Sequence, residues 1–175
     1  MDIWKEPDYT MVDIVSLEME LEKRRKVEDF VIQFFKDWES GVIASQQQQL
    51  VYTCQKIMRQ SKLVDHDYFK HIDHENFKPC FHTMCMELFK NGVADEYVIS
   101  LLAFCIEVNV YMQNHHHIWY TSRQLITPLI GVLEQMKFDP IQFNLNQTER
   151  DFFVKIATSF VIIIPSLLFF YLLLK

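Results

Sequence analysis

The chain has 175 residues, a formal net charge of −6 and 50% hydrophobic residues, but only 3 glycines and 5 prolines. Sheet sandwiches and barrels need many turns that favour glycine and proline, so this composition excludes most all-β folds and favours helices. An acidic chain without a basic stripe among aromatic residues is not expected to bind nucleic acid. The 4 cysteines include no CxxC pair, and we expect free, buried thiols in a reducing cytosol.

The first long helix is predicted from Met11 to Glu39, after a polar and loose N-terminus at residues 1–10. Gly41 is expected to end it. Its apolar stripe has the spacing i, i+3, i+4, i+7, i+8 and consists of Val27, Phe30, Val31, Phe34 and Phe35. The basic residues 23–26 lie among acidic ones and are interpreted as an exposed helix face.

Two further helices follow. One is predicted from Gln48 to about Leu63, and its apolar face is formed by Leu50, Val51, Cys54, Ile57 and Met58. Residues 64–77, rich in His and Asp, are interpreted as short irregular helical turns. The next helix is expected to begin with Asn76 as its cap, to hold Pro79 in its first turn and to end at Asn91-Gly92. Its apolar stripe is Phe81, Met84, Cys85, Leu88 and Phe89.

A fourth helix is expected to begin at Asp95 and Glu96, because acidic residues are favourable at a helix N-terminus. Residues 97–112 are apolar nearly all round, and such a helix is buried on all sides. It is too short and, with Glu107 and Asn109, too polar to cross a membrane. We therefore predict the central helix of the domain here. A fifth helix is predicted from Ile118 to about Met136, followed by a short amphipathic stretch.

The C-terminal region contains 19 consecutive uncharged and mostly apolar residues, 156–174. A helix of that length spans about 28 Å, close to the hydrocarbon core of a bilayer, and lipid-embedded helices tolerate a proline such as Pro165. We expect a C-terminal transmembrane tail anchor. The expected organisation is a loose N-terminus (1–10), one all-α bundle around a buried central helix (11–145), a linker (146–155) and the anchor (156–174).

The stretch Glu-Leu-Phe-Lys-Asn-Gly-Val at residues 87–93, followed by an apolar helix, resembles the first homology motif of the Bcl (B-cell lymphoma) family of apoptosis regulators. Residues 27–31 are similar to the family's fourth motif, which lies on the first helix. Leu50 precedes Phe89 by about the family distance between the third-motif Leu and this Phe. The tail anchor also matches, and residues 74–92 are most similar to viral, particularly gammaherpesvirus, members.

The departures from the family pattern concern ligand binding. Ala94-Asp95-Glu96-Tyr97 stands where the family has Asn-Trp-Gly-Arg, and that Arg pairs with an invariant Asp of the bound pro-death helix. Tyr97 cannot supply this charge. The third motif lacks its small residue and its acid, which are replaced by Cys54 and Gln55, so this segment is poorly suited to act as a killer ligand. Residues 138–141 replace the Gly-Gly-Trp of the second motif.

The resemblance implies an anti-apoptotic regulator, not an enzyme, that needs no cofactor or metal. It would capture amphipathic helices of pro-apoptotic family members in an apolar groove and restrain mitochondrial permeabilisation. The protein would face the cytosol, anchored in the outer mitochondrial membrane or the endoplasmic reticulum. Its choice of ligands and the formation of a homodimer stay open. The expected groove residues are Ile57, Met58, Leu63, Phe81, Met84, Glu87, Leu88, Ala94, Tyr97, Ile99 and Leu101.

Other classes of function were weighed against this one. A tail-anchored tethering or trafficking protein is one alternative, although residues 138–149 show no heptad repeat. A pore-forming, pro-death member of the same family is another. A metal site built from the seven histidines with Cys80 or Cys85 would lack the paired ligand spacing of zinc sites. Nucleophilic catalysis would lack any local signature.

Overall fold

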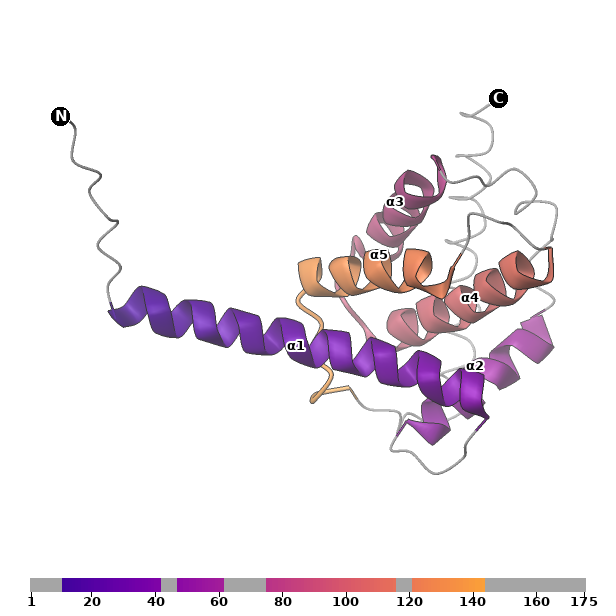
Figure 1. The fold of residues 1–175 in the computed structure, drawn as a ribbon, viewed down its shortest axis with the longest axis horizontal. Helices are drawn as coiled ribbons and strands as arrows, with labels where there is room; N and C mark the ends of the chain where they lie inside the picture. The colour runs from indigo at the N-terminus through magenta and orange to yellow at the C-terminus, as the bar shows by residue number, and fades with distance from the viewer. Residues whose placement is uncertain (1–10, 42–46, 62–74, 116–120, 144–175) are drawn as a thin grey trace.

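The computed structural model describes residues 11–41, 47–61, 75–115 and 121–143. These residues form five helices, and every regular element among them is a helix (Figure 1). The expected all-α bundle is therefore confirmed. The helices are α1 (Met11–Ser40), α2 (Gln48–Ser61), α3 (Phe77–Phe89), α4 (Asp95–Asn114) and α5 (Ser122–Gln135).

Glycines end α1 and α3 where the sequence predicts. Gly41 follows α1 with φ +62°, and Gly92 follows α3 with φ +106°. Both angles lie in the left-handed region, which glycine adopts without the steric penalty of a Cβ atom. The backbone N–H of Gly92 donates to the carbonyl of Phe89 at 2.9 Å, which closes the turn after α3. The chain can then reverse directly into α4.

The helix starts agree only in part with the predictions. Asn76 directly precedes α3, but its backbone angles (φ −91°, ψ −16°) are helical rather than the extended ones of a capping residue. Its predicted position is right and its predicted capping is wrong. α5 begins at Ser122, after a capping box in which Thr121 and Gln124 exchange hydrogen bonds. Residues 118–120, predicted as its first residues, lie outside the described part.

The central helix of the bundle is α4. α2 packs on it from one side, and α3 and α5 pack on it from the other (Figure 1). Most of its 20 residues are buried, including Ile99, Leu102 and Ile106, each at 0% exposure. This burial confirms the prediction from its all-round apolar character.

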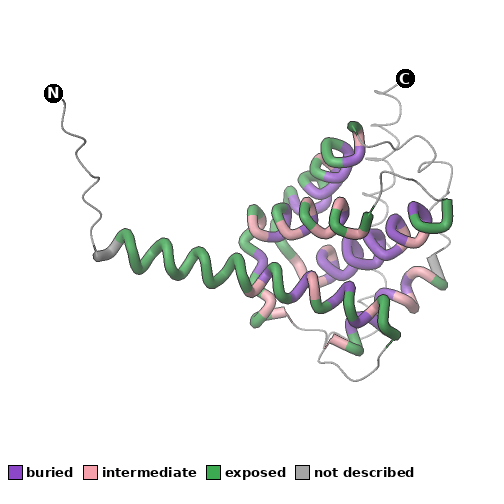
Figure 2. Tube along the Cα trace, viewed as in Figure 1, coloured by how far each residue is buried: buried purple, intermediate pink, exposed green. Residues whose placement is uncertain are grey.

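The two halves of α1 differ in their surroundings. The predicted stripe from Val27 to Phe35 is buried against α5 and α2, which confirms that prediction. Residues 13–25 extend beyond the bundle, and Figure 2 shows this half exposed along its length. Only the second half of α1 therefore contributes to the core.

The chain after α5 folds back onto α1. Lys137 takes a positive φ of 56° at the turn, and Phe138 then packs against Phe30 with ring centroids 5.3 Å apart. Phe143 lies 5.6 Å from Phe30 and 5.7 Å from Phe138. All three pairs are edge-to-face, an arrangement that the ring quadrupoles favour. The three phenylalanines join two segments that are about a hundred residues apart.

The membrane prediction falls on residues that the structure does not describe. None of the described helices combines the length and hydropathy that a bilayer crossing requires. The loose N-terminus (1–10), the linker (146–155) and the anchor (156–174) all lie outside the described residues.

Candidate functional site

Six of the predicted groove residues are packed inside the bundle. They come from α2, α3 and α4, and each is between 0% and 3% exposed: Ile57, Phe81, Met84, Leu88, Ile99 and Leu101. All six belong to one hydrophobic cluster. The structure therefore brings the predicted residues together, but as core in this conformation rather than as the lining of an open groove. Leu63 lies outside the described residues.

The other four predicted groove residues reach the surface. Met58, Ala94 and Tyr97 are half-buried, and Glu87 is exposed. Tyr97 packs edge-to-face on Phe89, with ring centroids 6.5 Å apart. Glu87, Ala94 and Tyr97 border the region where α3 turns into α4, whereas Met58 lies on α2.

α2 and α3 both reach the first half of α4: the Cys54 thiol of α2 contacts the Ile99 carbonyl, and Phe89 of α3 packs on Tyr97. Each packs on the central helix, whereas within the described ranges the two do not pack against each other to a comparable extent. Figure 1 shows them on opposite sides of α4. Residues 62–74, which connect them, lie outside the described residues. A ligand helix that contacts the predicted residues would have to approach α4 between α2 and α3.

The rim of this region carries charges of both signs. Glu87 forms an exposed ion pair with Lys90 at 3.0 Å. Asp95 and Glu96 occupy the first turn of α4, where the helix dipole favours negative charge. Glu96 is buried, and its carbonyl accepts a hydrogen bond from the Ser100 hydroxyl at 2.7 Å. An acidic group on a bound helix would meet Asp95 here, beside the Glu87–Lys90 pair.

The second half of α4 contains two polar residues, Glu107 and Asn109, that lie partly or fully inside the bundle. The sequence analysis uses them only as an argument against a membrane span. Burial raises the pKa of Glu107 to about 7. No donor in the described part of the chain lies within hydrogen-bond distance of its buried Oε2 atom. Asn109 is buried, and its Oδ1 atom accepts a hydrogen bond from the Ser122 hydroxyl at 3.2 Å. In the sequence, this polar site is indicated by Glu107 and Asn109 within the mostly apolar residues 97–112.

The cysteines are free and buried, as the sequence predicts. Burial raises the pKa of both Cys54 and Cys85. It also raises the pKa of Cys105, with smaller contributions from Cys85 and Cys54. The Cys54 thiol donates a weak hydrogen bond to the carbonyl of Ile99 at 3.8 Å. Since the thiolate is the reactive form, these thiols act as small apolar groups rather than nucleophiles.

The histidines do not assemble a metal site in the described part of the chain. His82 is exposed and lies 3.4 Å from the Gln135 side chain, while His115 stacks on Tyr111 with ring centroids 3.9 Å apart. Among the described residues, no group of three His, Cys, Asp or Glu side chains could hold a metal ion. The other histidines lie outside the described residues.

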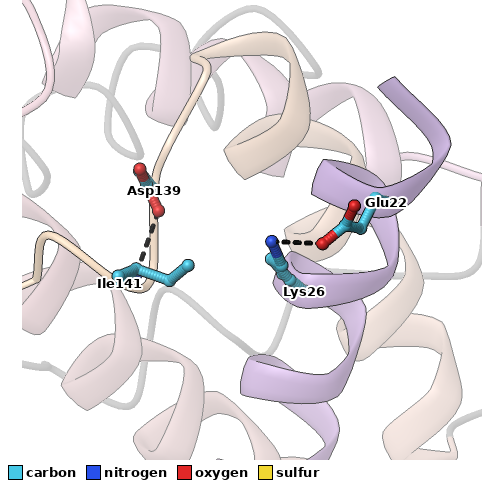
Figure 3. A network of polar contacts seen from close by, with 4 residues as sticks. All are labelled: Glu22, Lys26, Asp139 and Ile141. Carbon is cyan, nitrogen blue, oxygen red and sulfur yellow. Dashed lines mark hydrogen bonds and ion pairs between the residues drawn. The ribbon is translucent and has the colours of Figure 1, made fainter. Parts of the chain in front are cut away.

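A surface pocket lies between α1 and the segment after α5. It has a volume of ≈ 610 Å³, and basic and acidic side chains alternate around Val27, Phe138 and Pro140. In the same area, Lys26 pairs with Glu22 at 2.6 Å, and Asp139 accepts a hydrogen bond from the backbone of Ile141 at 3.0 Å (Figure 3). Sequence reasoning missed this pocket because no local pattern predicts that these segments meet.

In comparisons with protein-family models, with curated proteins and with solved structures, the chain has no match.

Proposed function

We propose that the chain is an anti-apoptotic regulator of the Bcl type, which captures amphipathic helices of pro-apoptotic proteins between α2, α3 and α4. The position of residues 87–93 carries this proposal. The stretch that resembles the family's first homology motif spans the end of α3 and the turn into a buried central helix. A motif, a turn and a buried helix in this order are what the resemblance implies for a helix-binding groove.

Capture requires the bundle to open. Met84 and Leu88 on α3 and Ile57 on α2 are buried, so a ligand helix must move α2 or α3 away from α4 and replace core contacts with its own apolar anchors. The free energy of opening is subtracted from that of binding, which lowers the apparent affinity by the fraction of open molecules. Association is then expected to be slower than the ~10⁵–10⁷ M⁻¹s⁻¹ of preformed sites.

The ligand would be held mainly by apolar contacts. Tyr97 occupies the place where the family has its Arg, and it packs on Phe89. The neighbouring Asp95 is acidic, and Glu87 already pairs with Lys90. The invariant Asp of a pro-death helix would therefore contribute little to binding here, in contrast to the charge-assisted pair that the resemblance implies.

The uncharged residues 156–174 suggest where in the cell the protein would act. As a tail anchor, they would hold the bundle at the cytosolic face of the outer mitochondrial membrane or the endoplasmic reticulum. Pro-death proteins act at these membranes, so the anchor would raise the local concentration of the groove near its ligands. The protein would act by binding rather than by catalysis.

A gain of binding in the Tyr97→Arg variant tests the proposal. The full chain in detergent micelles is titrated with fluorescent pro-death helix peptides, with and without an Asp→Ala change. We expect the parent chain to bind both peptides about equally. Tyr97→Arg should bind the Asp peptide about tenfold more tightly and the Ala peptide unchanged, as one charge-assisted hydrogen bond predicts.

The matched control is Tyr52→Arg, which adds the same charge at a tyrosine that is 63% exposed on α2. It should leave both affinities unchanged. If no peptide binds to the folded parent chain and Tyr97→Arg restores none, the capture mechanism is wrong. The tethering alternative would then be the better explanation of a tail-anchored helical protein.

A further inference from the structure

Three of the four cysteines lie in the core, one on each helix that borders the predicted groove. Cys54 of α2, Cys85 of α3 and Cys105 of α4 are each 0% exposed. All three belong to the hydrophobic cluster of the bundle, whereas Cys80 does not. The Cys54 thiol donates to the Ile99 carbonyl and therefore lies where α2 meets α4.

Cys85 lies on the side of α3 that faces α4. Phe89 follows it by one helical turn, on the same face, and packs on Tyr97 of α4 with ring centroids 6.5 Å apart. Cys105 of α4 is close to Cys85, because burial, and to a smaller extent repulsion by Cys85, raises the pKa of the Cys105 thiol. The two thiols therefore lie near each other, beneath α3.

α3 lacks features that stabilise the neighbouring helices. Its N-terminus has no side-chain cap and no acidic residue in the first turn. By contrast, α4 begins with Asp95 and Glu96, and α5 has a capping box. Within the described ranges, α3 also packs on α4 less extensively than α2 does. A helix of 13 residues is marginal without packing, so we expect α3 to open locally before the rest of the bundle unfolds.

We propose that Cys85 and Cys105 form a modification site that opens when α3 lifts from α4 and that takes an uncharged carbon electrophile, such as an α,β-unsaturated carbonyl compound. Met84 and Leu88 lie beside Cys85 on α3 and are buried in the same cluster. These apolar surroundings favour an apolar, uncharged reagent over a charged one. The site itself does not depend on the proposed function.

The reactivity of the site changes when α3 lifts. In the closed bundle, burial raises the pKa of the Cys85 thiol, so the thiol is both covered and protonated. Contact with water removes this cause and restores the reactive thiolate. Its sulfur forms a bond to the β carbon of the electrophile, the π electrons move to the α carbon, and this carbon takes up the proton that the thiol released. The adduct no longer fits a close-packed core, so α3 cannot return to its closed position.

A consequence for ligand capture rests on the proposed function. If α3 is a wall of the groove, an adduct on Cys85 occupies space beside Met84 and Leu88 that an apolar anchor of the ligand helix would fill. The modified chain should therefore bind pro-death helix peptides at least about tenfold more weakly than the unmodified chain. The Cys85→Ala, Cys105→Ala double variant, treated in the same way, should keep its affinity. Equal affinities of the parent chain before and after modification would overturn this consequence.

Labelling of the full chain in detergent micelles with N-ethylmaleimide, followed at each cysteine by mass spectrometry, tests the proposal. Cys85 should react at least about tenfold faster than Cys54, which α2 continues to cover. Cys105 should follow Cys85, because α3 cannot close again over the adduct. A rate for Cys85 or Cys105 no higher than that of Cys54, which is the result of global unfolding or of movement of α2, would overturn the proposal.

A variant that loosens α3 sharpens the test. Phe89→Ala removes the contact with Tyr97 and should speed the labelling of Cys85 at least about tenfold without a change at Cys54. Phe138→Ala, a matched truncation at a ring that packs on α1, should leave the labelling of Cys85 unchanged. Equal acceleration of Cys85 and Cys54 by Phe89→Ala would overturn the proposal. If no peptide binds the chain in either state, the proposed function fails, while the order of labelling still decides whether the modification site exists.

Discussion

The two halves of α1 form one continuous helix, yet different interactions stabilise them. In the packed half, from Val27 to Ser40, Phe34 is 0% exposed and Phe35 is 2% exposed. In the projecting half, residues 13–25, Leu17 is 50% exposed and Leu21 is 61% exposed. Both halves contain apolar residues, so composition does not distinguish them. The difference shows that an apolar residue on α1 is buried only where α5 and α2 lie beside the helix, and residues 13–25 extend beyond them.

The largest expected effect comes from truncating the core of the packed half. Phe34→Ala should lower the free energy of unfolding by about 3–5 kcal/mol, because it leaves a cavity in the bundle. Leu17→Ala should change it by less than about 0.5 kcal/mol, because Leu17 is 50% exposed and lies outside the core. Urea unfolding followed by circular dichroism measures both. Equal losses would show that the bundle also covers the first half of α1.

The aromatic cluster that fastens the C-terminal stretch to the packed half gives the next effect. Phe138 is 7% exposed and contacts both Phe30 and Phe143. Phe138→Ala should cost about 2–3 kcal/mol, somewhat less than a fully enclosed phenylalanine. A double-mutant cycle with Phe30→Ala should give a coupling of about 0.5–1.5 kcal/mol. Additive losses would mean that the two rings do not interact in solution.

Two acids on different helices, Glu107 on α4 and Glu22 on the exposed half of α1, have pKa values that shift in opposite directions. In the core, burial raises the pKa of Glu107 from 4.5 to about 7. Between these values the folded chain keeps a proton that the unfolded chain has lost, so stability falls as the pH rises from 4.5 to 7. On the projecting half, the hydrogen bond and the charge of Lys26 lower the pKa of Glu22, which is fully exposed.

Glu107→Gln should therefore stabilise the protein at pH 8, where the parent side chain is ionised. The gain should be about 1 kcal/mol, because Glu107 is only partly shielded from solvent. At pH 4.5, where the parent side chain is protonated in the folded state, the two proteins should be nearly equal. Glu22→Gln is the matched control and should produce no such increase at pH 8. Urea midpoints across this pH range measure both, and a flat difference for Glu107→Gln would contradict the assignment.

The sequence was sufficient to predict the packed elements of the fold. The stripes of α1, α2 and α3, the burial of α4 and the glycines that end two helices all follow from local spacing and backbone sterics. The packing of Phe138 on Phe30 was not predictable, because no local rule relates segments so distant in sequence. The exposure of residues 13–25 was not predictable either, because local spacing does not show how far the other helices extend along α1.

The sequence predicted which residues of the candidate site lie close together, but not whether they are exposed or buried. The family resemblance grouped residues such as Ile57, Leu88 and Ile99 from three helices, and the structure places them in one hydrophobic cluster. The same apolar spacing describes a core and a groove equally well, since both present apolar side chains inward. Whether those side chains are covered depends on how closely α2 and α3 approach α4, and this is a property of the tertiary packing.

The smallest expected effect concerns the boundary between the halves of α1. Arg24 lies there and pairs with Glu134 on α5 at 3.1 Å, but its side chain is 68% exposed. Water and salt screen such a pair, so Arg24→Ala should lower the free energy of unfolding by no more than about 0.5 kcal/mol. Hydrogen exchange of residues 13–25 should remain much faster than that of the packed half in both proteins. If the free energy of unfolding falls by more than about 1 kcal/mol, the ion pair rather than the buried residues from Val27 onward holds α1 against α5.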